Sequence, residues 1–88
     1  MDTIWVLQSE WKTENDSDDD LDLYDRREDA LSAFDAKIKE LWDKLHLDDY
    51  PKEDLKIDRR KDMFGWYEVQ SDLHNIYVYV SVATYGVN

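Results

Sequence analysis

One apolar stripe in the middle of the chain constrains the fold more than any other feature. Between residues 26 and 47, large apolar side chains recur at steps of three and four, which is the period of a helix that buries one face: Leu31, Phe34, Ile38, Leu41, Trp42 and Leu45. Pro51 lies just beyond this segment, where a proline commonly follows a helix end. The pattern predicts one long amphipathic helix over residues 26–47.

Asp25 and Glu28 mark the predicted start of this helix. Their spacing is that of a capping box, with Asp in place of the usual Ser or Thr. We therefore expect the Asp25 carboxylate to cap the first turn, because the first backbone N–H groups of a helix have no partner within it.

Two strands are predicted before the helix. Residues 3–11 are rich in β-branched and aromatic side chains and apolar on both faces at their centre, which is typical of a central strand. Residues 20–25 alternate between acidic and apolar side chains. We expect the two leucines of this strand to point into the core and the alternate side chains to point outward: Leu21 and Leu23 inward, and Asp20, Asp22 and Tyr24 outward. Residues 12–19 form the predicted loop of this hairpin.

Two more strands are predicted after the helix, over residues 63–70 and 75–85. In the last strand the valines share one face, and Tyr77 and Tyr79 share the other. Residues 48–62 carry nearly balanced charge and leave two alternatives open, which are a short edge strand around Leu55 and Ile57 or a helical turn that begins at Pro51.

These elements predict a single α+β domain over residues 1–88. An antiparallel sheet of about four strands carries one long helix on one face, in a ββαββ-like order. One helix cannot cover both faces of such a sheet, so the tyrosine face is expected to look outward. We assign Trp5, Trp42 and Trp66 to the core.

The net charge of the chain is −11, from 22 acidic and 11 basic residues. Such a charge repels nucleic acid, whose phosphates are bound by Lys and Arg, and it repels anionic membranes. It attracts basic protein surfaces and speeds association with them. The alternative is that the acidity only keeps a small protein dispersed in water.

Residues 14–25, ENDSDDDLDLYD, hold seven acidic residues and no basic one. Carboxylates two apart on a strand stand about 6.6 Å apart, so a row of them can take the place of a stretch of phosphodiester in a basic groove. The alternative is a solvated, disordered acidic loop. The predicted partner-binding residues combine this segment with the two tyrosines of the last strand: Glu14, Asp16, Asp18, Asp19, Asp20, Asp22, Tyr24, Asp25, Tyr77 and Tyr79.

Other chemistry has weak support in the sequence. Four alternate aspartates from Asp16 to Asp22 match the first positions of an EF-hand loop, but Leu21 replaces its glycine and Arg27 its bidentate glutamate. His46 and His74 belong to no metal-ligand motif, cysteine is absent, and no serine lies in a nucleophile motif. We therefore expect no metal, no cofactor and no enzymatic activity.

The N-terminal residues lack the basic region of a signal peptide, and no apolar run approaches the length of a membrane helix. We expect a cytoplasmic protein. An exposed tyrosine face or a bare edge strand leaves monomer and homodimer both open.

The length, the charge, the segment ENDSDDDLDLYDRRED and the aromatic last strand together resemble a known type of protein. It comprises the small acidic proteins with which bacteriophages and mobile elements disable host defences, the anti-CRISPR proteins and the anti-restriction DNA mimics. The resemblance is one of type, without an alignable motif. It implies a non-enzymatic inhibitor in the bacterial cytoplasm that occupies the basic surface of a nucleic-acid-binding nuclease, such as a CRISPR effector.

Two alternatives from other classes stay open at this point. An immunity-type protein that neutralises a basic toxin would use the same acidic and aromatic surface. A small phage structural or adaptor protein would need no tight basic partner at all.

Overall fold

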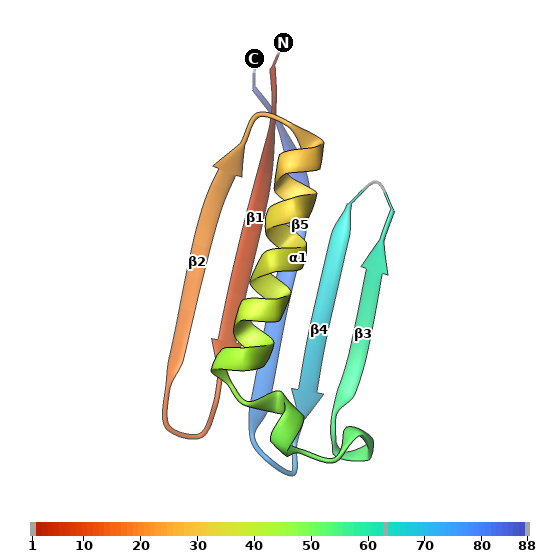
Figure 1. Cartoon of the computed structure of the whole chain (residues 1–88). Helices are drawn as coiled ribbons and strands as arrows, with labels where there is room; N and C mark the ends of the chain where they lie inside the picture. The colour runs from red at the N-terminus through yellow and green to blue at the C-terminus, as the bar shows by residue number, and fades with distance from the viewer. Residues whose placement is uncertain (1, 63, 88) are drawn as a thin grey trace.

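The computed structural model describes residues 2–62 and 64–87, which form five antiparallel strands and one α-helix (Figure 1). The sheet order is β2-β1-β5-β4-β3, with the helix α1 across one face. In chain order the elements are β1 (Asp2–Lys12), β2 (Ser17–Tyr24), α1 (Arg27–Lys44), two 3₁₀ turns (Leu47–Asp49 and Lys52–Asp54), β3 (Lys56–Lys61), β4 (Gly65–Ser71) and β5 (Ile76–Val87).

The predicted α+β class, with one antiparallel sheet and one helix, is confirmed. The sheet has five strands instead of about four because the segment 48–62 supplies β3 as an edge strand. Both alternatives for that segment occur in succession, since Pro51 precedes the turn Lys52–Asp54 and β3 follows it. Met63, the first residue of the predicted strand 63–70, lies outside the described residues.

The core lies between α1 and the side of β1, β5 and β4 that faces it. Phe34 is fully buried at its centre, against the valine face of β5 that the sequence predicted. The ring of Phe34 comes so close to β4 that a Cβ on Gly65 would lie 3.0 Å from it. Gly65 therefore lets the helix pack tightly on the sheet.

The prediction that Asp25 caps the helix is wrong. Arg26 is the N-cap residue, and no side chain caps the first turn. Glu28 and Asp29 lie in that turn instead, where acidic side chains interact favourably with the helix dipole. At the other end the helix stops at Lys44, and His46 adopts a left-handed backbone with φ 53°.

The predicted orientation of β2 is also wrong. Leu21 and Leu23 are 56% and 60% exposed. The register pairs Leu7, which is buried under α1, with Asp22, so the alternate residues Asp18, Asp20, Asp22 and Tyr24 lie on the helix side of the sheet. The physical reason is that α1 lies over β1 and β5 and leaves β2 beyond its edge. Apart from Tyr24, which packs against the core, every side chain of β2 is exposed. The alternation of leucines therefore does not indicate which side of β2 faces the helix.

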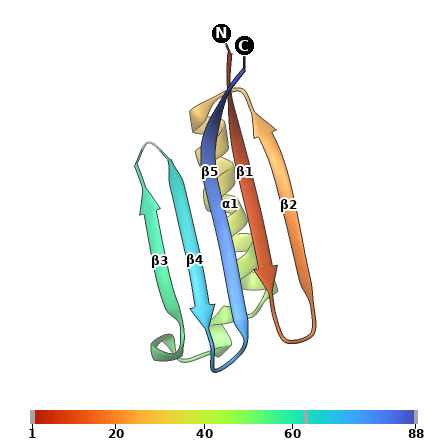
Figure 2. The same ribbon diagram turned by 180° about the vertical axis from the view of Figure 1, so that it is seen from behind.

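The face of the sheet opposite α1, called the open face below, carries no helix in the described part of the chain (Figure 2). Tyr77 and Tyr79 lie on it, as predicted, because they alternate with the buried valines of β5. Trp66 also lies there and is 39% exposed, so its assignment to the core is wrong. Trp5 and Trp42 are half-buried and pack against the core. No helix among the described residues is long and apolar enough to cross a membrane.

Candidate partner-binding surfaces

Three aspartates of the edge strand β2 form a line on its helix side, here called the β2 acidic row: Asp18, Asp20 and Asp22. All three are exposed, and neighbours in the line are separated by about 6.6 Å along the strand. The row borders α1, where the ammonium of Lys37 lies 3.7 Å from the Asp20 carboxylate. Within residues 2–62 and 64–87 this is the row's one ion pair.

Lys37 neutralises the row only in part. Its ammonium donates a hydrogen bond of 2.8 Å to Glu40, one turn further along α1. That hydrogen bond is the main reason why the pKa of Lys37 is raised, and the charges of Asp20 and Asp22 add to the effect. The cation is therefore held chiefly by the helix, so the row keeps most of its negative potential.

The backbone of β2 holds alternate aspartates in place. The N–H groups of Ser17, Asp19 and Leu21 each donate a bond of 2.9 Å to the Oδ1 atom of the preceding aspartate. An edge strand leaves alternate N–H groups without a strand partner, and these carboxylates satisfy them. The edge is thereby shielded against the addition of another strand, while the Oδ2 atoms of Asp16 and Asp18 remain for other partners and that of Asp20 faces Lys37.

The loop before β2 is shorter than the predicted loop 12–19. The N–H of Thr13 donates to the carbonyl of Asp16 at 2.8 Å, which closes a tight connection between β1 and β2. Because β2 already begins at Ser17, Asp18 and Asp19 lie in the strand, and Glu14 and Asp16 are left in the turn. Asp25 is exposed at the bend between β2 and α1.

The structure divides the predicted partner-binding residues between two faces. The β2 acidic row and the half-buried Tyr24 lie on the helix side, whereas Asp19, Tyr77 and Tyr79 lie on the open face. A flat partner surface cannot contact both sets at once. The predicted single site is therefore two surfaces that meet along β2.

Three of the four basic residues of the opposite edge strand are paired with nearby acids. Arg59 and Lys61 of β3 contact the two carboxylate oxygens of Asp35 at 2.8 and 2.5 Å, and Arg60 contacts Asp58 at 3.3 Å. The two edges of the sheet thus differ in charge, with paired charges on β3 and mostly unpaired acids on β2.

The open face combines aromatic rings with acids. Trp66 and Tyr79 meet edge to face with ring centroids 5.0 Å apart. The register places Glu10 and Glu68 on either side of Tyr79, on the neighbouring strands β1 and β4. The pKa of Tyr77 is raised by partial burial, and the negative charges of Glu68 and Glu10 add to the effect.

Trp66, Glu10 and Glu68 were not predicted from the sequence as candidate surface residues. The signal for Trp66 was present, because it alternates in β4 with Gly65 and Tyr67, which are both buried. Placing Trp66 in phase with Glu68 and Gln70 would have indicated an exposed position.

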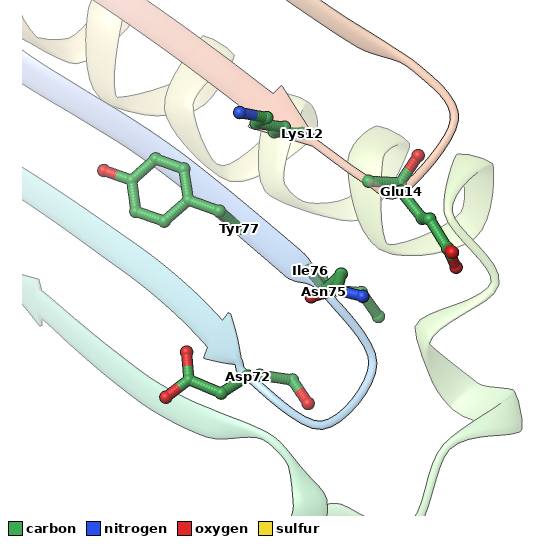
Figure 3. Close-up of a pocket in the computed structure, with 8 residues that line it drawn as sticks. Lys12, Glu14, Asp72, Asn75, Ile76 and Tyr77 are labelled. Atoms are coloured by element: carbon green, nitrogen blue, oxygen red, sulfur yellow. The ribbon is translucent and has the colours of Figure 1, made fainter.

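A hollow of about 480 Å³ lies at the end of the sheet where the β1–β2 turn meets the β4–β5 turn (Figure 3). Glu14 enters it from one turn and Asp72 from the other, and Lys12 and Tyr77 lie beside each other on paired strands. The carboxylates of Glu14 and Asp72 are solvated. They therefore lack the contrasting environments that acid–base chemistry requires.

Of the two histidines, His74 makes contacts that hold two segments of the chain together. Nε2 of His74 lies 3.0 Å from the Asp54 carboxylate, and its ring packs against that of Tyr50, tilted by 48°, with centroids 4.5 Å apart. These contacts join the β4–β5 turn to the segment before β3. His46 is exposed. In the described part of the chain no group of three or more His, Cys, Asp or Glu side chains is placed to hold a metal ion.

Comparison of the chain with protein-family models, with curated proteins and with solved structures finds no match.

Proposed function

We propose that this chain is a non-enzymatic inhibitor that binds the basic nucleic-acid-binding surface of another protein. In this proposal the β2 acidic row takes the position of backbone phosphates. Asp16 and Glu14 extend the row at the turn, and Tyr24 and Asp25 extend it toward the helix.

The observation that carries the proposal is the β2 acidic row itself, a set of carboxylates that the chain neutralises only in part, through Lys37 at Asp20. Successive phosphates of one B-DNA strand rise about 3.4 Å each along the helix axis. Because successive phosphates are also rotated about that axis, their direct separation is larger than this rise, and carboxylates about 6.6 Å apart form a repeat of the same order. Arg and Lys side chains that grip a phosphate backbone also form strong charge-assisted hydrogen bonds with carboxylates.

The proposed partner is a protein and not a nucleic acid, because the net charge of −11 opposes binding to phosphates. The resemblance to anti-defence proteins suggests the class of partner, a bacterial nuclease such as a CRISPR effector, which grips nucleic acid in a basic channel. In that case the protein acts in the bacterial cytoplasm.

The experiment is capture of partners from a bacterial lysate by the purified chain, with low-salt and high-salt washes. The β2 variant D18N/D20N/D22N is compared with the control variant D49N/E53Q/D72N, which loses three exposed acids elsewhere. Asn keeps the Oδ1 acceptor that the β2 backbone uses, so the strand should stay intact.

The proposal expects a nucleic-acid-binding protein that is retained by the wild type and the control, lost from the β2 variant and from high-salt washes, and competed by duplex DNA. Equal capture by both variants would remove the β2 acidic row from the proposal. If the captured protein is a toxin and not a defence nuclease, the binding surface stays as proposed. The function is then that of the immunity alternative.

A further inference from the structure

We propose that the open face is a second docking surface and that its occupant is an amphipathic, basic segment of a partner protein. The segment's apolar side covers the apolar end of the face, and its Arg or Lys side chains reach a row of acids beside it. This inference goes beyond the proposed function, since it concerns another face of the sheet and, apart from Asp19, other acids.

The apolar end of the open face is made by cross-strand neighbours. Leu23 lies opposite Val6 and Leu21 opposite Gln8, and Val6 in turn lies opposite Ala83 of β5. Trp66 on β4 lies opposite Ser81 and beside Tyr79, and it lines the same hollow as Ala83. Leu21 and Leu23 are more than half exposed, and they are the two residues whose alternation in the sequence would suit a buried position.

A row of acids crosses the open face next to this patch, here called the open-face acid row. The strand pairings align Asp19, Glu10, Glu68 and Asp58, with Tyr79 between the two glutamates. Neighbouring strands are about 4.8 Å apart, so the row spans the width of the sheet. Lys12, Lys56 and Arg60 lie on the same face. Among the described residues Arg60 pairs with Asp58, and no cation lies within ion-pair distance of the other three acids of the row.

The open-face acid row works against the stability of the sheet. Glu10 lies directly opposite Asp19, and Glu68 directly opposite Asp58. Like charges in such cross-strand pairs are destabilising. Arg60 already offsets the charge of Asp58. A cationic side chain from a partner would relieve the Glu10–Asp19 pair, and an Arg would in addition stack on the rings of Trp66 and Tyr79.

Charge decides between the candidate occupants. A second copy of this chain, packed face to face, would bring two open-face acid rows together in a protein whose net charge is −11. A neutral apolar partner would bury the carboxylates of Glu10 and Glu68 without compensation, which costs free energy. An amphipathic basic segment covers the leucines and neutralises the row at the same time.

The test uses a synthetic amphipathic peptide of Leu and Arg as the probe, with a peptide of Leu and Glu as its control. Binding is followed by fluorescence anisotropy and by chemical-shift changes of the tryptophan indole N–H groups. The acid variant E10Q/E68Q is compared with E53Q/D72N, which removes two acids elsewhere. The apolar variant L21T/L23T is compared with I57T/L73T, which removes two other exposed apolar side chains.

We expect E10Q/E68Q and L21T/L23T each to weaken binding of the Leu/Arg peptide about tenfold, as for central interface residues, while their controls bind like the wild type. The Trp66 indole should shift on binding. Equal affinity of all four variants, or shifts confined to the indoles of Trp5 and Trp11 on the helix side, would overturn the inference and leave the proposed function intact. Concentration-dependent shifts of Trp66 without peptide would also overturn it, in favour of a second copy.

Discussion

The helix α1 and the strand β2 follow one another in the sequence but differ in how far their side chains are buried. α1 buries five side chains against the sheet, whereas seven of the eight residues of β2 are exposed and the eighth is half-buried. The two elements differ because α1 lies over the centre of the sheet and β2 at its edge. Stability is therefore expected to depend on α1, and the proposed binding on β2.

Phe34 gives the comparison its largest expected effect. Phe34→Ala removes a fully buried ring next to Gly65 and leaves a cavity, so we expect the free energy of unfolding to fall by about 3–5 kcal/mol. Urea unfolding followed by tryptophan fluorescence measures the loss. A loss below about 1 kcal/mol would mean that α1 is not the centre of the core.

The triple change D18N/D20N/D22N tests β2 in the opposite sense. We expect partner binding to fall at least about tenfold, because each charge-assisted hydrogen bond is replaced by a weaker neutral one. The urea midpoint should stay equal or rise slightly, since repulsion within the β2 acidic row is relieved. A variant that binds normally but unfolds more easily would reverse the roles assigned to the two elements.

Lys37 of α1 forms an ion pair with Asp20 of β2. The substitution Lys37→Met tests what this ion pair contributes. Met keeps the apolar stem and removes the charge, so the stability should change by no more than about 1 kcal/mol. Binding through the β2 acidic row should be retained or become tighter, because Asp20 loses its cation. Titration of the captured partner with both forms checks this, and a large loss of affinity would show that Lys37 belongs to the binding surface.

The leucines of β2 give the smallest expected effect. L21T/L23T should change the free energy of unfolding by no more than about 0.5 kcal/mol per site, because both side chains are exposed and Thr suits a strand. Thermal unfolding beside the wild type measures it. A loss of several kcal/mol would restore the original expectation that these leucines are part of the core.

The helix and the sheet class could be predicted from the sequence because burial leaves a period in it. The apolar residues of the helix stripe and of one face of β5 are buried in the structure, among them Phe34 and Val80. The face of β2 could not be predicted in this way. Its neighbour β1 is apolar on both faces at its centre, so the side that α1 covers is not visible in its pattern.

The candidate site was predictable as a set of residues and not as a geometry. The acids of residues 14–25 lie near one another, as expected from their proximity in the sequence. Their division between two faces follows from the alternation of side chains along a strand. Which set shares the face of Tyr77 and Tyr79 depends on the register that pairs Leu7 with Asp22 and on where α1 lies. Glu10 and Glu68 are far apart in the sequence. Only the sheet order places them on the two strands beside Tyr79.

The most direct test of the proposed function is displacement of a labelled DNA duplex from the captured partner, followed by fluorescence anisotropy. The account predicts that the wild type and D49N/E53Q/D72N displace the duplex at the same concentration, and that D18N/D20N/D22N requires at least about tenfold more protein. Displacement by all three at equal concentrations, or a duplex that stays bound while the chain binds, would contradict the claim that the β2 acidic row takes the place of phosphates.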